Sequence, residues 1–305
     1  MFEEKMKPEP RGMSSTLIIL NPAAHSERAQ KKRAQVESLA RGCVFCTTSQ
    51  TGEAELMARR GVQEGFEKIV AAGGDGTINE VVNGICHSEL GPRSNIALGL
   101  LPIGTMNVFA TELGLPVHDL ELCWNIIQSD STRSVDLPKA NQKFFVQLAG
   151  VGLDAQVVQE TSAQFKRNFG PLSYLISAAQ IAARRPPRLS IESGDAPVKE
   201  GSFVLVGNGR LYGGPFPFFK HASLDDGKLD VVVFKSLGYL EIIKYLQDVV
   251  FSSEIRVPEV EYFQTSRLRV DSEQLVPVEL DGELVGNCPV EFSLEERSLR
   301  VLAPA

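Results

Sequence analysis

The order of apolar and polar positions divides the chain into two parts. Up to about residue 130, short runs of consecutive apolar residues alternate with longer polar stretches of helical composition. Strands that are apolar throughout are typical of a parallel sheet covered by helices on both faces. The runs predict strands at residues 16–20, 44–47, 68–72 and 96–101, and the stretches predict helices at 26–41, 53–60, 77–85 and 106–113. We therefore expect an α/β domain with a doubly wound sheet.

Strand-like runs dominate the remainder of the chain, and only residues 172–183 and 240–250 have a helical pattern. The predicted strands are residues 144–148, 188–191, 203–206, 229–234, 267–270, 276–280, 290–294 and 299–302. This profile is typical of a β-sandwich. We expect the α/β domain at residues 14–133 and a β-sandwich domain at residues 134–294, with residues 295–305 as a candidate addition to the first domain.

Composition and charge exclude several classes of protein. Of the 305 residues, 43% are hydrophobic and 23% are charged, which excludes a disordered, collagenous or coiled-coil chain. With 31 basic and 38 acidic side chains the net charge is −7, which argues against nucleic acid as a partner. The five cysteines, an odd number, favour the reduced thiols of a cytoplasmic protein. No apolar run approaches the roughly 20 residues that cross a bilayer, so we expect any membrane contact to be peripheral.

A glycine-rich turn, Gly73-Gly74-Asp75-Gly76-Thr77, lies between a predicted strand and a predicted helix. Glycines let the backbone approach a ligand closely, so that successive N–H groups and the helix N-terminus can face one anion. We favour phosphate binding over a turn that needs glycines for geometry alone. Asp75 would repel a phosphate directly, but it suits a direct or water-mediated contact with the Mg²⁺ that accompanies a nucleotide.

Two further turns lie between a strand and a helix, Asn21-Pro22-Ala23-Ala24 and Pro102-Ile103-Gly104-Thr105-Met106-Asn107. Thr105 can cap the following helix and hydrogen-bond a phosphate oxygen, and Asn107 offers an amide. On a doubly wound sheet all three turns lie at the carboxyl ends of the strands, where ligands bind. Together the turns predict that the first domain binds a nucleotide.

The segments Gly73–Val81 and Leu101–Asn107 resemble the diacylglycerol kinase catalytic-domain family, which includes soluble bacterial diacylglycerol kinases and the sphingosine and ceramide kinases. The resemblance extends from about Leu17 to Leu302, in the family's order. Its later matches are Gly207–Gly214, Leu224–Val231 and Leu280–Glu283. The glycine-rich turn alone would also fit NAD kinases and phosphofructokinases, and the later motifs separate them.

The resemblance implies an ATP- and Mg²⁺-dependent lipid kinase, cytoplasmic and peripherally associated with the membrane. It would transfer the γ-phosphoryl group of ATP to a lipid hydroxyl. Diacylglycerol, which would give phosphatidic acid, is the first substrate expected. Sphingoid bases, ceramide, phosphatidylglycerol and polyprenols stay open as substrates, and a homodimer is an allowed assembly.

The family's functional positions carry over to named residues of this chain. Glu283 would accept the proton of the lipid hydroxyl, and Asp75 would act beside the nucleotide. The positions that match the family's ATP contacts are Asn21, Pro22, Ala23, Thr48, Gly74, Asp75, Gly76, Thr77, Ile78, Asn79, Glu80 and Thr105. Those that match its Mg²⁺ site are Ser223, Asp226 and Lys228. Thr48 is placed by its spacing to Gly52-Glu53-Ala54.

The residues around Glu283 are compatible with this role but do not require it. Asp281-Gly282 favours a type I′ hairpin turn between strands at residues 276–280 and 283–285, which would fix Glu283 at the start of a strand. Without the resemblance, a solvated hairpin glutamate is the simpler interpretation. Asp225-Asp226-Gly227 alone is likewise typical of a solvated turn.

Two departures from the family pattern bear on the alternatives. The family commonly has Asp where this chain has Val108, and many relatives have Pro where it has Lys220. Val108 is the one feature that supports a non-catalytic, nucleotide-responsive lipid-binding protein. The other alternative, an NAD kinase-like phosphotransferase, is disfavoured by Asp281-Gly282-Glu283 and by Leu224–Asp230.

Two features predict contact with a membrane. The segment Phe216-Pro217-Phe218-Phe219 is unusually aromatic, and basic residues flank the apolar helix expected at 172–183. The basic residues are Lys166, Arg167, Arg184, Arg185 and Arg188. A basic fringe beside exposed apolar groups suits an anionic bilayer. The apolar positions of the helix lie at helical spacing, however, and fit a buried core better.

Overall fold

The computed structural model describes residues 15–22, 27–153, 155, 186–194, 198–235, 237, 238, 241, 242, 245 and 258–304. Outside these residues lie Ala23, the helix predicted at 172–183, most of the helix predicted at 240–250, and Lys166, Arg167, Arg184 and Arg185. The chain divides into two compact units. The first unit comprises residues 1–137, 213–215 and 295–305, and the second comprises residues 138–212 and 216–294.

The first unit is built on a parallel sheet, as its continuous apolar runs predict. The strands β1 (Thr16–Leu20), β2 (Val44–Thr47), β3 (Lys68–Gly73) and β4 (Ala97–Pro102) are hydrogen-bonded in the order β2-β1-β3-β4. β1 and β4 are buried along their whole length, and β3 is buried after its first residue. The end of β16 (Val290–Leu302) adds a parallel strand beside β4, through Arg300 and Val301.

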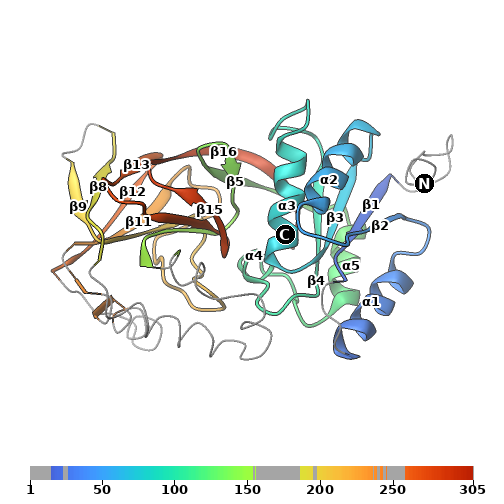
Figure 1. Cartoon of the computed structure of the whole chain (residues 1–305). Coiled ribbons are helices and arrows are strands. Elements are labelled where there is room, and N and C mark those ends of the chain that lie inside the picture. The colour runs from blue at the N-terminus through green and yellow to red at the C-terminus, as the bar shows by residue number, and fades with distance from the viewer. Residues whose placement is uncertain are drawn as a thin grey trace. The chain divides into compact units, whose positions relative to one another are not determined.

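The helices described in this unit cover both faces of the sheet (Figure 1). They are α1 (Glu27–Leu39), α2 (Glu53–Gln63), α3 (Asp75–Cys86), α4 (Val108–Glu112) and α5 (Leu120–Gln128). α2 packs against α3, and α1 packs against α5. Along the strand order β2-β1-β3-β4, the connection through α1 runs from β1 to β2 in one direction. The connections through α2 and α3 run from β2 to β3 and from β3 to β4 in the opposite direction. Right-handed connections therefore place α1 opposite α2 and α3. The predicted doubly wound α/β fold is confirmed.

The first unit differs from the sequence prediction at three elements. The prediction lacks helix α5, although the Asp119 side chain caps it by accepting hydrogen bonds from two amides of its first turn. The helix predicted at residues 106–113 is shorter, because Asn107 has a positive φ of 50° that a helix does not allow. The prediction also lacks β5 (Thr132–Ala140), whose first residues are exposed or half-buried and polar.

The second unit is a β-sandwich, as predicted. One layer is an antiparallel sheet in the order β12-β11-β10-β7-β14-β15. Its strands are β7 (Leu148–Val151), β10 (Phe203–Gly207), β11 (Leu229–Phe234), β12 (Val260–Thr265), β14 (Pro277–Leu280) and β15 (Glu283–Asn287). The other layer contains β8 (Leu189–Glu192), β9 (Lys199–Gly201), β13 (Arg267–Asp271) and the start of β16. Residues of both layers, among them Val204, Val231, Leu268 and Phe292, share one buried core.

The second unit also corrects the predicted strands. The run 144–148 is split into β6 (Lys143–Phe144) and β7, because the amides of Val146 and Gln147 donate to the carboxylate of Asp281 and not to a neighbouring strand. The runs 290–294 and 299–302 form the single strand β16, which pairs with β5. The prediction lacks β9 and β12, whose side chains are mostly only partly buried.

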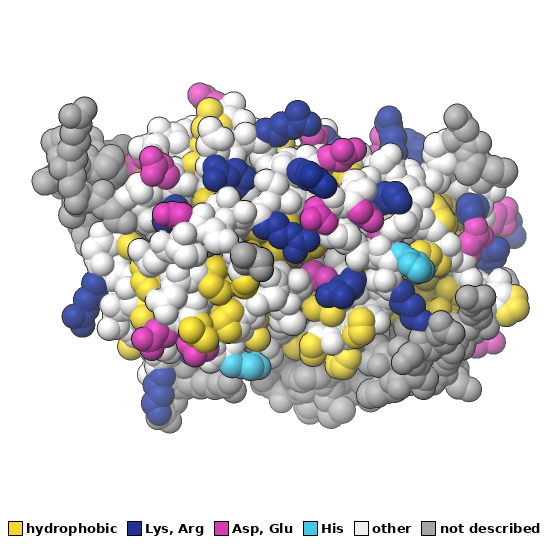
Figure 2. All heavy atoms as spheres, turned by 180° about the vertical axis from the view of Figure 1, so that it is seen from behind, with side chains coloured by type: hydrophobic (Ala, Val, Ile, Leu, Met, Phe, Trp, Pro, Cys, Tyr) yellow, Lys and Arg dark blue, Asp and Glu magenta, His cyan; other side chains and the backbone are white. Residues whose placement is uncertain are grey.

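Three observations bear on membrane contact. No helix in the described part of the chain is long and apolar enough to cross a membrane. Acidic and basic side chains are interspersed over the face in Figure 2. Phe218 and Phe219 belong to a buried cluster of the second unit, whereas Phe216 is 37% exposed. Two of the three aromatic residues predicted to contact a membrane are therefore core residues.

Candidate functional site

The three turns predicted to bind a nucleotide follow β1, β3 and β4 directly. The first two turns are joined by a side chain, since Asn21 Nδ2 donates a hydrogen bond of 2.9 Å to Thr77 Oγ1. The backbone amide of Asn21 also donates to the carbonyl of Ala72, at 3.0 Å. Thr48 follows β2 at the same edge, is buried, and donates its amide to the carbonyl of Leu20 at 3.0 Å.

The second and third turns are joined through their backbones. The amides of Ile103 and Gly104 both donate to the carbonyl of Gly73, at 3.1 and 3.2 Å. A Cβ atom at Gly104 would lie 2.4 Å from the Cα of Gly74, so no larger residue fits there without moving a backbone. The three turns thus form one connected surface at the carboxyl ends of the strands. Part of their glycine content is explained by this close packing alone.

Asp75 is the first residue of α3 and connects it to α4. Its Oδ1 accepts a hydrogen bond of 3.3 Å from the amide of Phe109, in the first turn of α4. The side chain is half-buried. Gly76 and Thr77 follow it in the first turn of α3, where a helix directs free amides and the positive end of its dipole outward, whereas the amide of Ile78 donates to the carbonyl of Gly74 at 3.1 Å.

The third turn differs from its predicted chemistry. Asn107, not Thr105, is the N-cap residue of α4, so the predicted capping role of Thr105 is wrong. Asn107 is buried, and its Nδ2 donates a hydrogen bond of 3.1 Å to the carbonyl of Gly104. Thr105 itself is exposed. Its predicted contact with a phosphate is compatible with this exposure and stays a prediction.

Glu80 has an unforeseen set of partners. Its Oε1 accepts from the amide of Gly52 at 2.8 Å, and its Oε2 accepts from the amide of Ala54 at 3.0 Å. Both oxygens therefore hold the N-terminus of α2. No local pattern predicts this contact, because Glu80 is 28 residues from Gly52. If Glu80 also contacts ATP, as predicted, its carboxylate oxygens would have to serve both ATP and the amides of α2.

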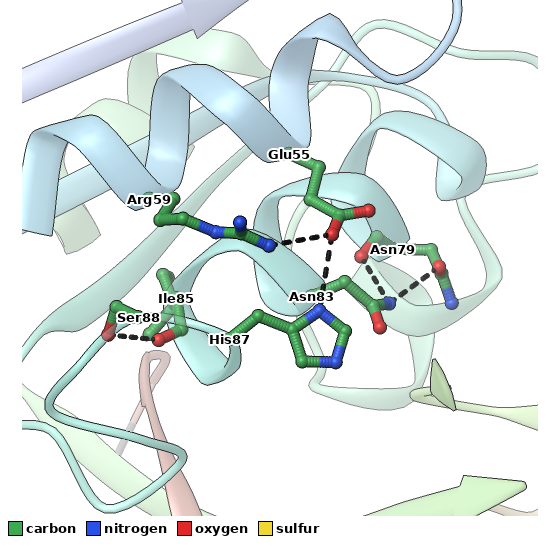
Figure 3. A network of polar contacts seen from close by, with 7 residues as sticks. All are labelled: Glu55, Arg59, Asn79, Asn83, Ile85, His87 and Ser88. Atoms are coloured by element: carbon green, nitrogen blue, oxygen red, sulfur yellow. Dashed lines mark hydrogen bonds and ion pairs between the residues drawn. The ribbon is translucent and has the colours of Figure 1, made fainter. Parts of the chain in front are cut away.

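Asn79, in α3, is one of the polar residues drawn in Figure 3. Its Oδ1 accepts a hydrogen bond of 2.9 Å from Nδ2 of Asn83, one helical turn later. Beside this pair, Glu55 Oε1 lies 3.3 Å from a guanidinium nitrogen of Arg59 and 3.1 Å from Nδ1 of His87. The contact between Glu55 and His87 joins α2 to the C-terminal end of α3.

The predicted hairpin turn before Glu283 is present in the second unit. Asp281 and Gly282 have φ values of 48° and 85°, the left-handed pair of a type I′ turn. Glu283 is the first residue of β15, pairs with Leu280, and has an exposed side chain. The buried carboxylate of Glu279 supports the turn by accepting from the amide of Gly282 at 2.7 Å. Glu283 is thus held at a strand end, as predicted.

The predicted metal turn is closed by its own side chains. Asp226 Oδ1 accepts from the amide of Lys228 at 3.0 Å, and Ser223 Oγ donates to Asp225 Oδ1 at 2.6 Å. Gln264 Nε2 lies 3.4 Å from Asp226 Oδ2. Within the described residues, no three His, Cys, Asp or Glu side chains gather as metal ligands. The exposed carboxylate of Asp226 is still an oxygen donor of the kind that suits Mg²⁺, an ion that keeps several of its waters.

A buried acid lies next to this turn and was missed by the sequence prediction. Asp230 is fully buried and accepts hydrogen bonds from the hydroxyl of Tyr262 and from Gln264 Nε2. Burial raises the pKa of the Asp230 carboxyl above its usual range. Burial and the neighbouring Asp230 raise the pKa of Tyr262 as well. The only signal in the sequence is an acidic residue within the apolar run 229–234.

Comparison with protein families covers almost the whole chain. Residues 15–140 match the diacylglycerol kinase catalytic domain, and residues 147–303 match the YegS C-terminal NAD kinase beta sandwich-like domain. The chain is 29% identical over 299 residues to a diacylglycerol kinase of Bacillus subtilis (strain 168), covering 96% of this chain and 97% of that protein. It is 32% identical over 260 residues to a diacylglycerol kinase of Staphylococcus haemolyticus (strain JCSC1435), covering 84% and 77%.

Solved structures with the same fold come from Bacillus anthracis (strain Sterne). One has a TM-score of 0.78 and 24% sequence identity, and covers 95% of this chain and 97% of that chain. Another, a diacylglycerol kinase, has a TM-score of 0.71 and 22% identity, and covers 95% and 96%. At these identities the likeness concerns the fold, which agrees with the α/β and β-sandwich architecture described above.

Proposed function

The chain belongs to the diacylglycerol kinase family, and we propose that it is an ATP-dependent lipid kinase whose first substrate is diacylglycerol. Its product would be phosphatidic acid. The observation that carries the proposal is the junction of the three turns at the ends of β1, β3 and β4, through Asn21, Thr77, Gly73 and Gly104. A connected set of turns, one of them glycine-rich, at the carboxyl edge of a doubly wound sheet is suited to the phosphates of a nucleotide.

The first unit would bind ATP. The residues proposed to contact it are Asn21, Pro22, Ala23, Thr48, Gly74, Asp75, Gly76, Thr77, Ile78, Asn79, Glu80 and Thr105. Amides of the first turn of α3 would donate to phosphate oxygens, helped by the positive end of the helix dipole. Thr48 and Glu80 would act mainly by fixing the segment that leads into α2, because Thr48 is buried and both oxygens of Glu80 are hydrogen-bonded.

Mg²⁺ is proposed at two places, each with oxygen donors that suit it. Asp75 would face the ion that accompanies ATP, with one carboxylate oxygen held by the amide of Phe109. Asp226 would hold a second ion through its carboxylate, with the main-chain carbonyls of Ser223 and Lys228 as further donors. A bound Mg²⁺ supplies positive charge that offsets the charge of the nucleotide phosphates.

Glu283 would be the general base. As the lipid hydroxyl oxygen bonds to the γ-phosphorus, the bond from that phosphorus to the β,γ-bridging oxygen breaks and ADP leaves. The hydroxyl proton passes to the carboxylate of Glu283 and from there to water. Proton acceptance by a positioned carboxylate contributes roughly 10²- to 10⁴-fold to a rate. Because Glu283 is exposed at the start of β15, its carboxylate would be accessible to the lipid hydroxyl.

The test is transfer of labelled phosphate from [γ-³²P]ATP with Mg²⁺ by the full chain. Separate reactions contain dioleoylglycerol, sphingosine, ceramide, phosphatidylglycerol or undecaprenol in mixed micelles, or NAD in buffer. Label in the organic phase, identified as phosphatidic acid by mass spectrometry, supports the proposal. Phosphorylation of NAD alone would support the NAD kinase-like alternative. Nucleotide binding with no phosphorylated product in any reaction would support the non-catalytic alternative.

A further inference from the structure

The carboxylate of Asp281 accepts hydrogen bonds from three consecutive backbone amides of the second unit. Its Oδ2 accepts from Val146 at 2.8 Å, and its Oδ1 accepts from Gln147 at 2.9 Å and Leu148 at 3.0 Å. The amide of Asp281 donates in return to the carbonyl of Leu148, at 2.8 Å. A concave run of amides of this kind is an anion-binding arrangement, filled here by a side chain of the protein.

A second motif holds the same segment from another direction. Asn208 Nδ2 donates to the carbonyl of Val146 at 2.9 Å, and the Asn208 amide donates to the carbonyl of Gln147 at 2.9 Å. Gln147 Nε2 donates to the carbonyl of Leu211 at 3.0 Å. Residues 146–148 are therefore fixed by the Gly207–Gly214 motif as well as by Asp281. The turn at Asp281, which is hydrogen-bonded to residues 146–148, is therefore fixed with them.

The anchored turn determines where β15 begins. Glu283 follows Asp281 by two residues and pairs with Leu280, which itself pairs with Ala149 of β7. The residues of β15 are exposed throughout, and among the described strands β15 lies at the end of its sheet, with β14 as its one neighbour. β14 is buried and pairs with β7, so the position of the exposed β15 is set by its ladder with β14 and by the turn that joins the two strands. The contacts of Asp281 hold that turn two residues before Glu283.

We propose that Asp281 is a positioning residue that acts through Glu283. This role rests on the proposed function, in which Glu283 accepts the proton of the lipid hydroxyl. A carboxylate suits the role for two reasons. Hydrogen bonds from amides to a charged acceptor are stronger than those to a neutral one. Asp also tolerates the left-handed φ of 48° that the turn requires.

Two substitutions of Asp281 remove different numbers of its hydrogen-bond acceptors. Asp281→Asn keeps the left-handed conformation and one oxygen, which can serve Gln147 and Leu148, but it removes the acceptor for Val146. Asp281→Gly keeps the conformation and removes every side-chain acceptor. Since a displacement of about 1 Å in a reacting group can cost about 10²-fold, we expect kcat to fall about 10-fold in Asp281→Asn and about 100-fold in Asp281→Gly. The KM for ATP should change less than about 2-fold in either.

A matched control separates positioning from loss of stability. Asp136 is an aspartate of the first unit whose carboxylate likewise accepts a hydrogen bond from a backbone amide, that of Arg297 at 2.7 Å; it is buried, whereas Asp281 is partly buried. Asp136→Asn should lower the melting temperature and leave kcat near that of the parent when both are assayed well below it. The positioning role of Asp281 would be overturned if the fall in kcat followed the fall in melting temperature across Asp281→Asn, Asp281→Gly and Asp136→Asn.

The deciding measurement is kcat for phosphatidic acid formation by Glu283→Gln, Asp281→Gly and the double variant. If Asp281 acts through Glu283, the double variant should be no slower than Glu283→Gln alone. Losses that multiply would overturn the role of Asp281 and leave the base assignment of Glu283 intact. Full activity of Glu283→Gln, or no lipid product from the parent, would overturn the proposed function and with it this role.

Discussion

The carboxylate of Glu80 accepts a hydrogen bond from the backbone amide of Gly52 at 2.8 Å, which ties the start of α2 to α3. The segment before Gly52 contains Thr48 and is closed from its other side by Glu53, whose Oε2 accepts from the amide of Ser49 at 2.6 Å. This hydrogen bond lowers the pKa of Glu53. Two carboxylates thus shape the segment that leads from β2 into α2.

Replacing Glu80 should affect stability and ATP binding together. Glu80→Ala leaves two amides at the start of α2 without acceptors, so we expect a loss of about 0.5–2 kcal/mol in the free energy of unfolding. The KM for ATP should rise several-fold with a smaller change in kcat, because the Thr48 segment loosens. Chemical denaturation and steady-state kinetics measure both. Glu53→Gln is the control in the same segment. A loss of ATP binding in Glu80→Gln without a loss of stability would instead indicate that the Glu80 side chain contacts ATP directly.

Gly104→Ala should disturb the nucleotide turns sterically. Its Cβ would lie 2.4 Å from the Cα of Gly74, a backbone atom, and 2.8 Å from Oδ1 of Asn107, whose side chain is buried and hydrogen-bonded through Nδ2. Overpacking of this kind costs about 1–3 kcal/mol. We expect the Kd for ATP, measured by calorimetry, to rise at least several-fold. Gly114→Ala is the control: an alanine would be strained at the φ of 75°, but its Cβ would meet no neighbouring group within 4 Å. Equal effects of the two substitutions on the Kd would contradict the joined-turn arrangement.

Asp75 should be required for phosphoryl transfer but not for folding. Asp75→Ala removes the proposed partner of Mg²⁺ and the acceptor for Phe109, and we expect labelled product to disappear while the circular dichroism spectrum is unchanged. Asp75→Asn restores an acceptor for the Phe109 amide without the charge. If the charge matters, Asp75→Asn should be as inactive as Asp75→Ala. Mg²⁺-dependent activity within a few-fold of the parent in either variant would remove the metal role.

The buried Asp230 should give a specific pH dependence to stability. Because burial raises its folded-state pKa above that of the unfolded chain, its favourable contribution is complete in acid and is lost as the pH rises through the folded-state pKa. Asp230→Asn keeps an acceptor for Tyr262 and carries no charge. Its free energy of unfolding, relative to the parent, should therefore increase as the pH rises from about 4 to about 7.

Asp271 is the control with the opposite sign. Its hydrogen bond to Arg269 lowers its folded-state pKa, so its contribution is present above the pKa of the unfolded chain and is lost as the pH falls. Asp271→Asn should therefore lose stability relative to the parent as the pH rises over the same range. Urea denaturation at each pH measures both variants. The same pH trend in both would contradict the assignment for Asp230.

The sequence predicts the fold well where the apolar pattern is local. Continuous apolar runs place β1, β2, β3 and β11 within one residue of their observed bounds. The run at 144–148 misleads because its apolar residues do not form one continuous strand: Asp281 accepts hydrogen bonds from the amides of Val146 and Gln147, between β6 and β7. Helix α5 has Leu120, Cys123 and Ile127 buried at helical spacing, but its nine residues give a weak period.

The candidate site is predictable where a turn follows a strand, and less so where a side chain crosses between elements. Asp281-Gly282 forms the expected turn because its preference is local. The capping of α2 by Glu80 and the burial of Asp230 against Tyr262 join residues that are distant in the chain. No local pattern carries such pairs, and only the fold brings them together.

The most direct test of the account is the kcat of Glu283→Gln for phosphorylation of dioleoylglycerol, with the Kd for ATP and the melting temperature measured on the same preparation. Glutamine keeps the size of the side chain but cannot accept the hydroxyl proton, so we expect kcat to fall roughly 10²- to 10⁴-fold. The exposed side chain should leave the Kd and the melting temperature nearly unchanged. Turnover equal to that of the parent would remove Glu283 from the mechanism and contradict the proposed catalytic site.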